Sequence, residues 1–413
     1  MKLIVQKFGG TSVRDLESRS RAVHHVKKAL NEGSKVVVTV SAMGRKGSPY
    51  ATDTLLSLIH FPDIDVSPRE QDLLMSCGEI ISSIVFCHEL CKEGIKAVSL
   101  TGAQAGIVTN DDFTKAKITQ MNPGRIYREL KQVDVVVVAG FQGQTLQGET
   151  TTIGRGGSDT TAAALGASLQ AEYIDIFTDV EGIMTADPRL VEGARPLPSI
   201  TYSEICNLAY QGAKVIHPRA VEIAMHAKVP IRVRSTYSDS PGTLVTGLKD
   251  HASGRDLIER TVTGIAHING LTQIKVQSKE DPSKLQSDVF KSMASANISV
   301  DFINISPSGV LYTISDLYTS KARRILQEIG YEPEIREGCA KVSTVGAGIT
   351  GIPGVTADIV QALTDKGIQI LQSADSHTTI WVLIKEEHLI QAVNALHDVF
   401  QLSHTTRKGE MQP

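Results

Sequence analysis

Two short runs in the first 140 residues restrict the fold more than any other feature, because both are almost entirely apolar. Residues 36–40 read VVVTV and residues 133–139 read VDVVVVA. A strand that is apolar on both faces must be covered on both faces, as in a parallel sheet between two layers of helices. Segments with helical character lie between such runs. The pattern therefore predicts an α/β/α sandwich with a mostly parallel central sheet.

The first domain is expected to span residues 1–245, with strands and helices in alternation. We expect strands at Leu3–Phe8, Lys35–Val40, Ala97–Leu100, Val133–Ala139, Tyr173–Thr178 and Ile231–Arg234. We expect helices at Leu16–Asn31, Ser67–Glu93, Asp159–Leu169, Tyr202–Tyr210 and Ala220–Ala227.

The periodicity changes beyond a polar stretch at residues 246–260, which is typical of a linker. The order strand, helix, strand, strand, helix then occurs twice, which predicts two small regulatory modules of the βαββαβ type. We place the first at residues 261–337 and the second at 338–404. Residues 405–413 are polar and are expected to form a flexible tail.

Composition excludes several classes of function. Lys and Arg number 42 against 45 Asp and Glu, so no net field favours nucleic acid or an anionic membrane. No apolar run approaches the length of a transmembrane helix, and the chain opens with a strand pattern rather than a signal peptide. The five cysteines are odd in number and contain no C-x-x-C pair, so we expect packing thiols in a reducing cytoplasm, with no zinc site.

Residues 151–162, TTIGRGGSDTTA, carry the most specific chemical signal. Gly154, Gly156 and Gly157 allow a ligand to approach the backbone closely, and the amides that open the following helix favour an anion. Arg155 adds a guanidinium suited to a carboxylate or a phosphate. The alternative is an ordinary turn capped by Ser or Asp, but a cap does not require the arginine. The loop therefore predicts an anion site.

The first strand runs into Lys7-Phe8-Gly9-Gly10, which places an ammonium beside amides that can bind phosphate. A solvated lysine before a glycine turn is the alternative. Open α/β sheets bind ligands at the carboxyl ends of their strands, so this motif and the Arg155 loop support each other. The chain has no Walker A or protein-kinase motif, so a phosphoryl-transfer enzyme would have to use another fold.

Together these residues resemble the aspartate kinases of the amino-acid kinase family, and most closely the type I members of bacilli. The resemblance rests on KFGGTSV, VSAMG, SCGE, GRGGSDTTAAALGA, FTDVEGIMTADPR, GAKVIHPRAVE and VPIRVRS, in that order. It implies an amino-acid kinase domain followed by two ACT domains. It also implies that the β-carboxylate of L-aspartate attacks the γ-phosphate of MgATP, giving 4-phospho-L-aspartate. Positioning and charge neutralisation carry most of such a transfer.

The resemblance also implies a role for each matching residue. Lys7 would neutralise the transferred phosphoryl group, Asp159 would orient Lys7, and Arg155 and Glu79 would hold the α-carboxylate and the α-ammonium of aspartate. The rest of the substrate site would be Ser41, Thr52, Gly156, Gly157 and Ser158. The nucleotide site would comprise Lys7, Phe8, Gly9, Gly10, Ser158, Thr178, Asp179, Met184, Asp187, Arg189 and Lys214. Mg2+ would arrive with ATP, and no metal site in the protein itself is expected.

The ACT resemblance implies feedback inhibition by an end-product amino acid of the aspartate pathway, which leads to lysine, threonine and methionine. The candidate effector residues are Asp281, Asn304, Gly348, Gly354, Val355, Ser373 and His377. Many lysine-sensitive members carry glutamate at the position of His377, and KEDPSK (279–284) replaces an Asp-x-Pro-Gly turn. These departures favour meso-diaminopimelate but leave lysine open. We also expect a homo-oligomer joined through the ACT domains.

Three other interpretations are open at this point. GAGITG (346–351), with Asp375 downstream, fits a dinucleotide-binding fingerprint, although the chain ends too soon to complete a Rossmann domain. A kinase for glutamate or another acidic metabolite would use the same fold. An amino-acid sensor without kinase activity would keep the second half of the chain, but the presence of Lys7, Arg155, Asp159 and Glu79 argues against it.

Overall fold

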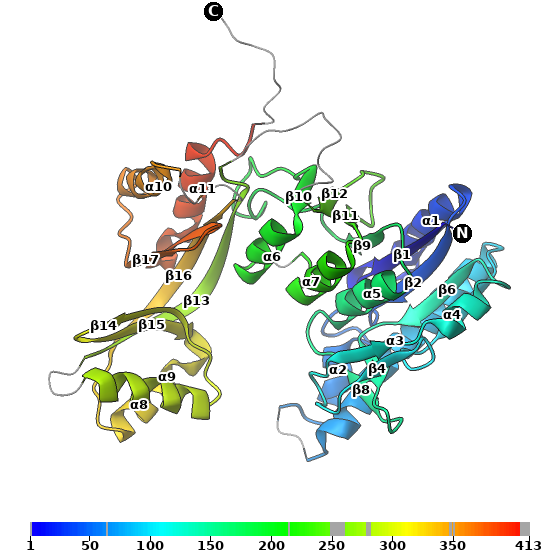
Figure 1. The fold of residues 1–413 in the computed structure, drawn as a ribbon, viewed down its shortest axis with the longest axis horizontal. Helices are drawn as coiled ribbons and strands as arrows, with labels where there is room; N and C mark the ends of the chain where they lie inside the picture. The colour runs from blue at the N-terminus through cyan, green and yellow to red at the C-terminus, as the bar shows by residue number, and fades with distance from the viewer. Residues whose placement is uncertain are drawn as a thin grey trace, which may run out of the picture. The chain divides into compact units, whose positions relative to one another are not determined.

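The computed structural model describes residues 2–62, 65–213, 215–247, 261–277, 282–346, 349 and 352–404, and these divide into two compact units (Figure 1). The N-terminal unit contains residues 2–184, 196–210 and 215–247. The C-terminal unit contains Thr185–Arg195, Gln211–Ala213 and residues 261–404. Two segments from within the expected first domain therefore belong to the second unit. Most of the expected linker and the whole expected tail lie outside the described residues.

An eight-stranded sheet forms the centre of the N-terminal unit. Its strand order is β10-β12-β11-β9-β1-β2-β6-β3, and every neighbouring pair is parallel except β11 and β12. The strands are β1 (Leu3–Phe8), β2 (Lys35–Val40), β3 (Ala97–Leu100), β6 (Val135–Ala139), β9 (Ile174–Thr178), β10 (Ser199–Thr201), β11 (Ile231–Ser235) and β12 (Thr243–Thr246). The predicted mostly parallel sheet is confirmed.

Helices cover both faces of this sheet. On one face, α1 (Leu16–Asn31) and α3 (Pro68–Lys92) bury a core that includes Ile4, Phe8 and Phe86. On the other face, α5 (Gly157–Ser168) approaches β9 so closely that a Cβ on Gly166 would lie 2.5 Å from the Ile174 side chain. The remaining helices of this unit are α2 (Thr52–Ser57), α4 (Gly124–Glu129), α6 (Tyr202–Tyr210) and α7 (Pro218–Ala227).

A second, four-stranded sheet in this unit is absent from the sequence-based expectations. Its order is β5-β4-β7-β8, with β4 (Ile107–Thr109), β5 (Ile118–Met121), β7 (Gln142–Gln144) and β8 (Thr150–Thr152). These strands have three or four residues, and two of them read QGQ and TTT. Such short polar segments lack the alternation by which a strand is recognised from sequence.

Helix α3 departs from the expectation that no apolar segment approaches the length of a transmembrane helix. Among the described residues it is the one helix long and apolar enough to cross a membrane, by length and composition alone. Of the apolar window, 44% is buried inside the unit, and core helices of soluble proteins pass the same test. Two acidic side chains of α3, Asp72 and Glu79, are buried in the unit.

The C-terminal unit is built on one antiparallel sheet with the order β14-β15-β13-β16-β18-β17. Its strands are β13 (Gly264–Gln277), β14 (Asp301–Ser306), β15 (Gly309–Ser315), β16 (Glu334–Val345), β17 (Gln372–Asp375) and β18 (Thr379–Lys385). Its helices are α8 (Pro282–Ser295), α9 (Thr319–Glu328), α10 (Val355–Thr364) and α11 (Leu389–Val399). The antiparallel pairing on both sides of β16 excludes a Rossmann unit at GAGITG, most of which lies outside the described residues.

The two predicted modules share this sheet because β13 pairs with strands of both modules. The second half of β13 pairs with β15, whereas its first half pairs with the second half of β16. Ile265, in the first half of β13, lies in the same core cluster as Ile359 and Leu396 of α10 and α11. The expected boundary between residues 337 and 338 therefore falls inside β16, and the first strand contributes to both modules.

Candidate active site

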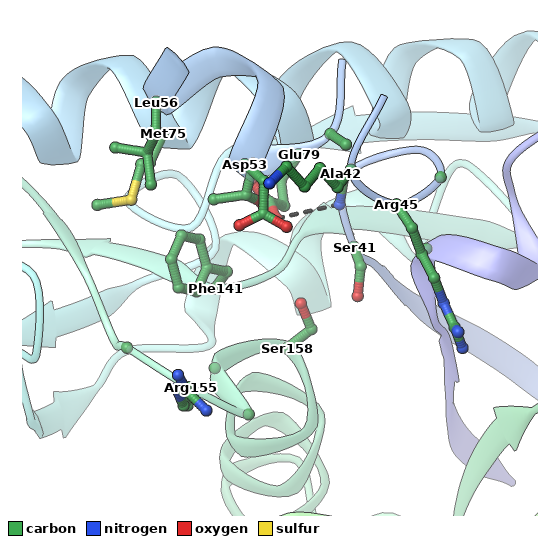
Figure 2. Close-up of a pocket in the computed structure, with 18 of the residues that line it drawn as sticks. Ser41, Ala42, Arg45, Asp53, Leu56, Met75, Glu79, Phe141, Arg155 and Ser158 are labelled. Carbon is green, nitrogen blue, oxygen red and sulfur yellow. Dashed lines mark hydrogen bonds between the residues drawn. The ribbon is translucent and has the colours of Figure 1, made fainter. Parts of the chain in front are cut away.

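A cavity of about 820 Å3 lies where β1 and β2 end and α5 begins (Figure 2). It brings together ten of the residues predicted for the catalytic, substrate and nucleotide sets: Lys7, Gly10, Ser41, Thr52, Glu79, Arg155, Gly156, Gly157, Ser158 and Asp159. These residues come from five separate stretches of the chain. The carboxyl ends of the parallel strands β1 and β2 bring two of these stretches together, and helices α2, α3 and α5 supply the other three.

Lys7 and Asp159 form an ion pair inside this cavity. Lys7 Nζ lies 2.7 Å from Asp159 Oδ1, and the two side chains are only 13% and 12% exposed. The other oxygen, Asp159 Oδ2, accepts a hydrogen bond of 3.2 Å from the backbone N–H of His217. Asp159 is thus anchored from two sides, and it fixes the position of the lysine ammonium.

The glycine loop before α5 has the backbone conformation that the sequence indicated. Gly154 and Gly156 have φ values of +77° and +67°, and Gly156 is the N-cap residue of α5. A Cβ on Gly156 would lie 2.2 Å from Cγ of His217, so this turn also needs glycine for packing. No described side chain caps the helix by a hydrogen bond, which argues against the alternative of a Ser or Asp cap. The N–H of Gly157 donates to Gly154 O at 3.0 Å, so an anion would be bound by the other amides at the start of α5.

Glu79 reaches the cavity from α3 and is 2% exposed. Its Oε1 accepts a hydrogen bond of 3.0 Å from the backbone N–H of Ala42, whereas Oε2 is buried without a hydrogen-bond partner among the described residues (Figure 2). Burial raises the pKa of Glu79 to about 8, although the Ala42 hydrogen bond opposes that shift. A carboxyl group in this state is suited to a cationic ligand, which would stabilise its ionised form.

Asp72 was not predicted, although it lies two helical turns before Glu79 on α3. Its buried carboxylate accepts hydrogen bonds from Thr114 N (3.0 Å), from Thr152 N (2.8 Å) and from the Thr152 hydroxyl. Burial raises the pKa of Asp72 and these hydrogen bonds oppose the shift. Thr114 lines the cavity, and Thr152 ends the strand that leads into the glycine loop. The seven-residue spacing from Glu79, which places both on one face of a helix, is the signal that could have identified Asp72.

Phe8 and Gly10 of the KFGG motif also contribute to packing. The Phe8 side chain lies in the core, stacked on Phe177 with ring centroids 4.8 Å apart, so only its backbone could contact a nucleotide. A Cβ on Gly10 would lie 2.6 Å from the carbonyl oxygen of Gly44, so Gly10 has a packing role as well. A Cβ on Gly9 would lie 3.3 Å from Lys7 Nζ, which places Gly9 beside the lysine.

The other predicted nucleotide residues do not line this cavity. Thr178 and Asp179 follow β9, where Asp179 forms an exposed ion pair of 3.0 Å with Arg45. Met184 belongs to the N-terminal unit, and Asp187 and Arg189 belong to the C-terminal unit. Lys214 lies outside the described residues.

The predicted effector residues are scattered over the described part of the C-terminal unit. Asn304 and Ser373 are exposed on β14 and β17, and His377 is exposed just before β18. Gly354 is the N-cap of α10 with a φ of +105°, and Val355 is buried at the start of that helix. Asp281 and Gly348 lie outside the described residues.

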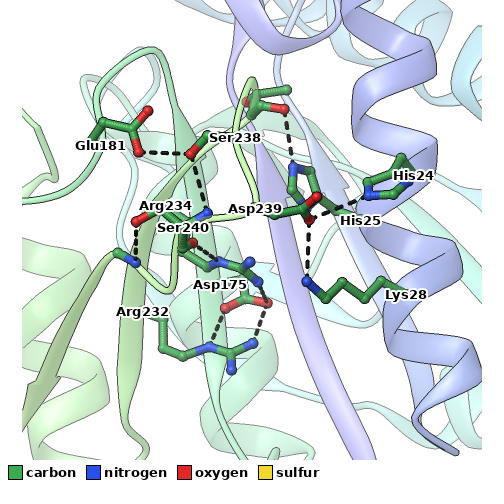
Figure 3. A network of polar contacts seen from close by, with 12 residues as sticks. His24, His25, Lys28, Asp175, Glu181, Arg232, Arg234, Ser238, Asp239 and Ser240 are labelled. Carbon is green, nitrogen blue, oxygen red and sulfur yellow. Dashed lines mark hydrogen bonds and ion pairs between the residues drawn. The ribbon is translucent and has the colours of Figure 1, made fainter.

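A second polar cluster has a structural explanation (Figure 3). Asp175 on β9 is fully buried and accepts hydrogen bonds from Arg232 Nε (2.6 Å), Arg232 Nη2 (2.8 Å) and Gln6 Nε2 (3.3 Å). Strand register places Gln6, Asp175 and Arg232 side by side. A buried carboxylate is tolerated when paired in this way, so the cluster ties β1, β9 and β11 together. Residues alternate along a strand, so Gln6 projects from the face opposite to Lys7.

Metal-binding and disulfide chemistry find no support in the described residues. No group of three or more His, Cys, Asp or Glu side chains in that part of the chain could hold a metal ion. The five cysteines all fall within it and are free thiols.

Comparison with known proteins agrees with this geometry. Residues 2–235 match the amino acid kinase family, and residues 334–398 match an ACT domain. The chain is 64% identical to aspartokinase 1 of Bacillus subtilis, over 98% of this chain and all of that protein. It is 41% identical to an aspartokinase of Geobacillus stearothermophilus, over 98% of each.

Two solved structures of one more distant relative share the fold. Aspartokinase III of E. coli in complex with aspartate and ADP is 26% identical, covers 96% of this chain and 99% of its own, and superposes with a TM-score of 0.77. The same enzyme in complex with lysine and aspartate is 27% identical with the same coverage, and superposes with a TM-score of 0.74.

Proposed function

Because this chain belongs to the amino acid kinase family and is an aspartokinase, we propose that the cavity at Lys7 binds L-aspartate and presents its β-carboxylate to the γ-phosphate of ATP. The products would be 4-phospho-L-aspartate and ADP. One observation carries the proposal: the anchored Lys7–Asp159 pair, the uncapped glycine loop with Arg155 and the buried Glu79 all line one cavity.

Lys7 would supply the charge neutralisation that phosphoryl transfer needs. Negative charge spreads over the oxygens of the transferred group, and a fixed cation in a partly buried site stabilises that charge. Asp159 orients the Lys7 ammonium through the 2.7 Å ion pair, and His217 N in turn holds Asp159. Asp159 is therefore engaged in positioning, and no proton transfer is assigned to it.

Arg155 and Glu79 would recognise the amino-acid end of the substrate. Aspartate offers an α-carboxylate, which suits the Arg155 guanidinium, and an α-ammonium, which suits Glu79. The buried, unpartnered Oε2 of Glu79 supports this role, because a bound ammonium would satisfy it. The hydroxyls of Ser41, Thr52 and Ser158 and the backbone of Gly156 and Gly157 complete the proposed lining.

ATP would use the backbone around Gly9 and Gly10 together with Thr178, Asp179, Met184, Asp187, Arg189 and Lys214. Mg2+ would enter as part of MgATP, where it shields phosphate charge, because this ion is usually bound by one or two carboxylates together with the phosphates of the substrate. The free thiols support a reducing compartment such as the cytoplasm.

We also propose that the C-terminal unit senses an end product of the aspartate pathway. The ACT match supports regulation by an amino acid, and the lysine-bound relative shows such a complex in another aspartokinase. For this chain meso-diaminopimelate and L-lysine are the candidate effectors, bound near Asn304, Gly354, Val355, Ser373 and His377, with Asp281 and Gly348. A homo-oligomer joined through the ACT domains is part of the proposal.

The test is aspartyl hydroxamate formation with MgATP, using L-aspartate and L-glutamate in parallel. We expect product with L-aspartate and at least a hundredfold less with L-glutamate, and we expect R155A and E79Q to raise KM for aspartate. Each reaction is repeated with meso-diaminopimelate, L-lysine or L-threonine. Equal rates with both substrates would contradict the substrate assignment, and no response to any of the three amino acids would contradict the assigned effectors.

A further inference from the structure

One segment of the kinase sequence is built into the regulatory unit. The kinase family match covers residues 2–235, yet Thr185–Arg195, inside that range, belongs to the C-terminal unit. The residues on either side, Met184 and Pro196, belong to the N-terminal unit and face each other in an antiparallel bridge. The chain therefore leaves the N-terminal unit after Met184 and returns to it at Pro196, and the segment between them packs within the C-terminal unit.

Apolar packing holds the inner side of this segment. Ala186 and Val191 are buried in the core cluster that also contains Ile265, Val342 and Leu396. These three residues come from β13, β16 and α11, which form the second ACT module. Side chains in such a core are closely packed, so a displacement of the module's helices or strands would also displace the segment.

Specific hydrogen bonds hold its backbone at three points. Near the start, Thr185 O accepts a hydrogen bond of 2.8 Å from Ile265 N. In the middle, Asn394 Nδ2 of α11 donates to Leu190 O at 2.8 Å. At the end, Arg195 Nε donates to Leu402 O at 2.8 Å. The beginning, middle and end of the segment are each fixed by a different part of the regulatory fold.

A buried histidine adds a further contact. His397 of α11 has no exposed surface, and its Nε2 lies 2.9 Å from the hydroxyl oxygen of Thr185. That hydroxyl also accepts a hydrogen bond from Arg195 N, which closes the two ends of the segment on each other. The Thr185 hydroxyl thus links α11 to both ends of the segment.

The outer side of the segment carries two of the proposed nucleotide residues. Arg189 donates from its backbone N–H and its guanidinium to the carboxylate of Asp187, which holds the pKa of Asp187 below its usual range. The Arg189 side chain is 85% exposed and the Asp187 side chain only 16%. Leu190, whose carbonyl Asn394 holds, is the next residue after Arg189.

We propose that Asn394 and His397 are positioning residues for nucleotide binding, acting from the regulatory module on the segment that carries Asp187 and Arg189. Asn394 fixes the backbone beside Arg189, and His397 fixes the end of the segment at Thr185. An effector that shifts α11 would then change the affinity for ATP through these contacts. The inference rests on the proposed nucleotide role of Asp187 and Arg189, and it adds a physical route for regulation of that site.

The experiment compares N394A and T185V with the matched control Q391A, an exposed position on the same helix. N394A removes the hydrogen bond to Leu190 O, and T185V removes the contacts of the Thr185 hydroxyl with His397 Nε2 and Arg195 N. Each substitution is expected to raise KM for ATP about fivefold and to leave KM for aspartate close to wild type. T185S keeps the hydroxyl and is expected to restore the wild-type KM for ATP. Asn394 also bonds within its own helix, to Ile390 O, and alanine is a good helix former, so α11 is expected to survive the substitution.

R189A measured in the same assay separates the two levels of the proposal. If R189A raises KM for ATP while N394A and T185V do not, the positioning role is wrong and the nucleotide assignment stands. If R189A leaves KM for ATP unchanged, both are wrong. Equal rises in KM for ATP and for aspartate, or a lowered Tm with no restoration in T185S, would indicate a merely structural role and would overturn the inference.

Discussion

Lys7 and Asp159 stand at the ends of two different elements, β1 and α5, and meet at 2.7 Å in the wall of the cavity. Each is the partner that makes the partial burial of the other acceptable, because an unpaired charge at this exposure would be costly. The pair thus joins the phosphate-binding turn after β1 to the glycine loop that carries Arg155.

Replacement of Lys7 should abolish turnover and keep the protein folded. In K7A the transferred phosphoryl group loses its fixed cation, so we expect kcat to fall at least about a thousandfold. Hydroxamate formation measures the loss, and circular dichroism checks the fold. K2A is the control, because Lys2 precedes the same strand and pairs with Glu172 in an exposed ion pair. Activity of K7A within tenfold of wild type would refute the assigned role.

The raised pKa of Glu79 predicts a pH dependence of stability. The pKa of Glu79 is about 8 in the folded protein and 4.5 for an ordinary glutamate, so between these pH values the folded protein binds a proton that the unfolded chain has lost. This residue's contribution should therefore lower the free energy of unfolding by roughly 1 kcal/mol per pH unit as pH rises from about 5 to 8. Urea unfolding of wild type and E79Q at several pH values isolates the contribution of Glu79 to the free energy of unfolding. Parallel curves for the two proteins would contradict the prediction.

Aspartate binding should release a proton near neutral pH. In the protein without substrate, Glu79 is largely protonated at pH 7, and a bound α-ammonium would favour its carboxylate form. Calorimetric titration in two buffers of different ionisation enthalpy measures the number of protons released, which should approach one per site in wild type and zero in E79Q. If the heats in the two buffers agree for wild type, Glu79 does not contact the ammonium.

Asp72 should support aspartate binding without touching the substrate. In D72N an amide N–H2 faces donors at Thr114 and Thr152, so we expect a loss of about 2–3 kcal/mol in stability and a rise of about tenfold in KM for aspartate. Thermal unfolding and initial rates measure the two effects. D111N, at an exposed position in the loop that contains Thr114, should change neither. A wild-type KM in D72N would leave Asp72 with a purely structural role.

Replacement of Gly156 by alanine should lower activity by more than the positive φ of this residue alone would cause. The added Cβ would lie 2.2 Å from His217 Cγ and 2.3 Å from His217 Cβ. G33A is the control, because Gly33 has a φ of +84° with nothing within 4 Å of an added Cβ, so only the backbone term of about 1 kcal/mol remains. We expect G156A to lose activity at least about a hundredfold and G156A/H217G to regain part of it. Equal effects of G33A and G156A on Tm and activity would show that the contact with His217 is unimportant.

Sequence patterns were sufficient where a few neighbouring residues decide the outcome. The predicted helices Leu16–Asn31 and Tyr202–Tyr210 and the strands Leu3–Phe8 and Lys35–Val40 match the observed bounds. Helix α5 begins two residues before the predicted Asp159, because Gly156 adopts a left-handed conformation that ends the loop at that point. The place of Lys7 in the site was predictable from its strand end, because open α/β sheets bind ligands at the carboxyl ends of their strands, whereas Glu79 reaches the site from within helix α3 and Asp159 from the start of α5.

The sequence by itself determined the sandwich, the glycine loop, the lysine strand end and the family to which the chain belongs, because each is encoded in local apolar pattern or in a contiguous motif. Only the tertiary structure decided that Asp72 holds the loop beside Arg155, that β13 serves both ACT modules and that Thr185–Arg195 belongs to the regulatory unit. These outcomes depend on hydrogen bonds and packing between residues far apart in the chain, such as Leu190 with Asn394. No periodicity within a single segment records which distant partner it will meet.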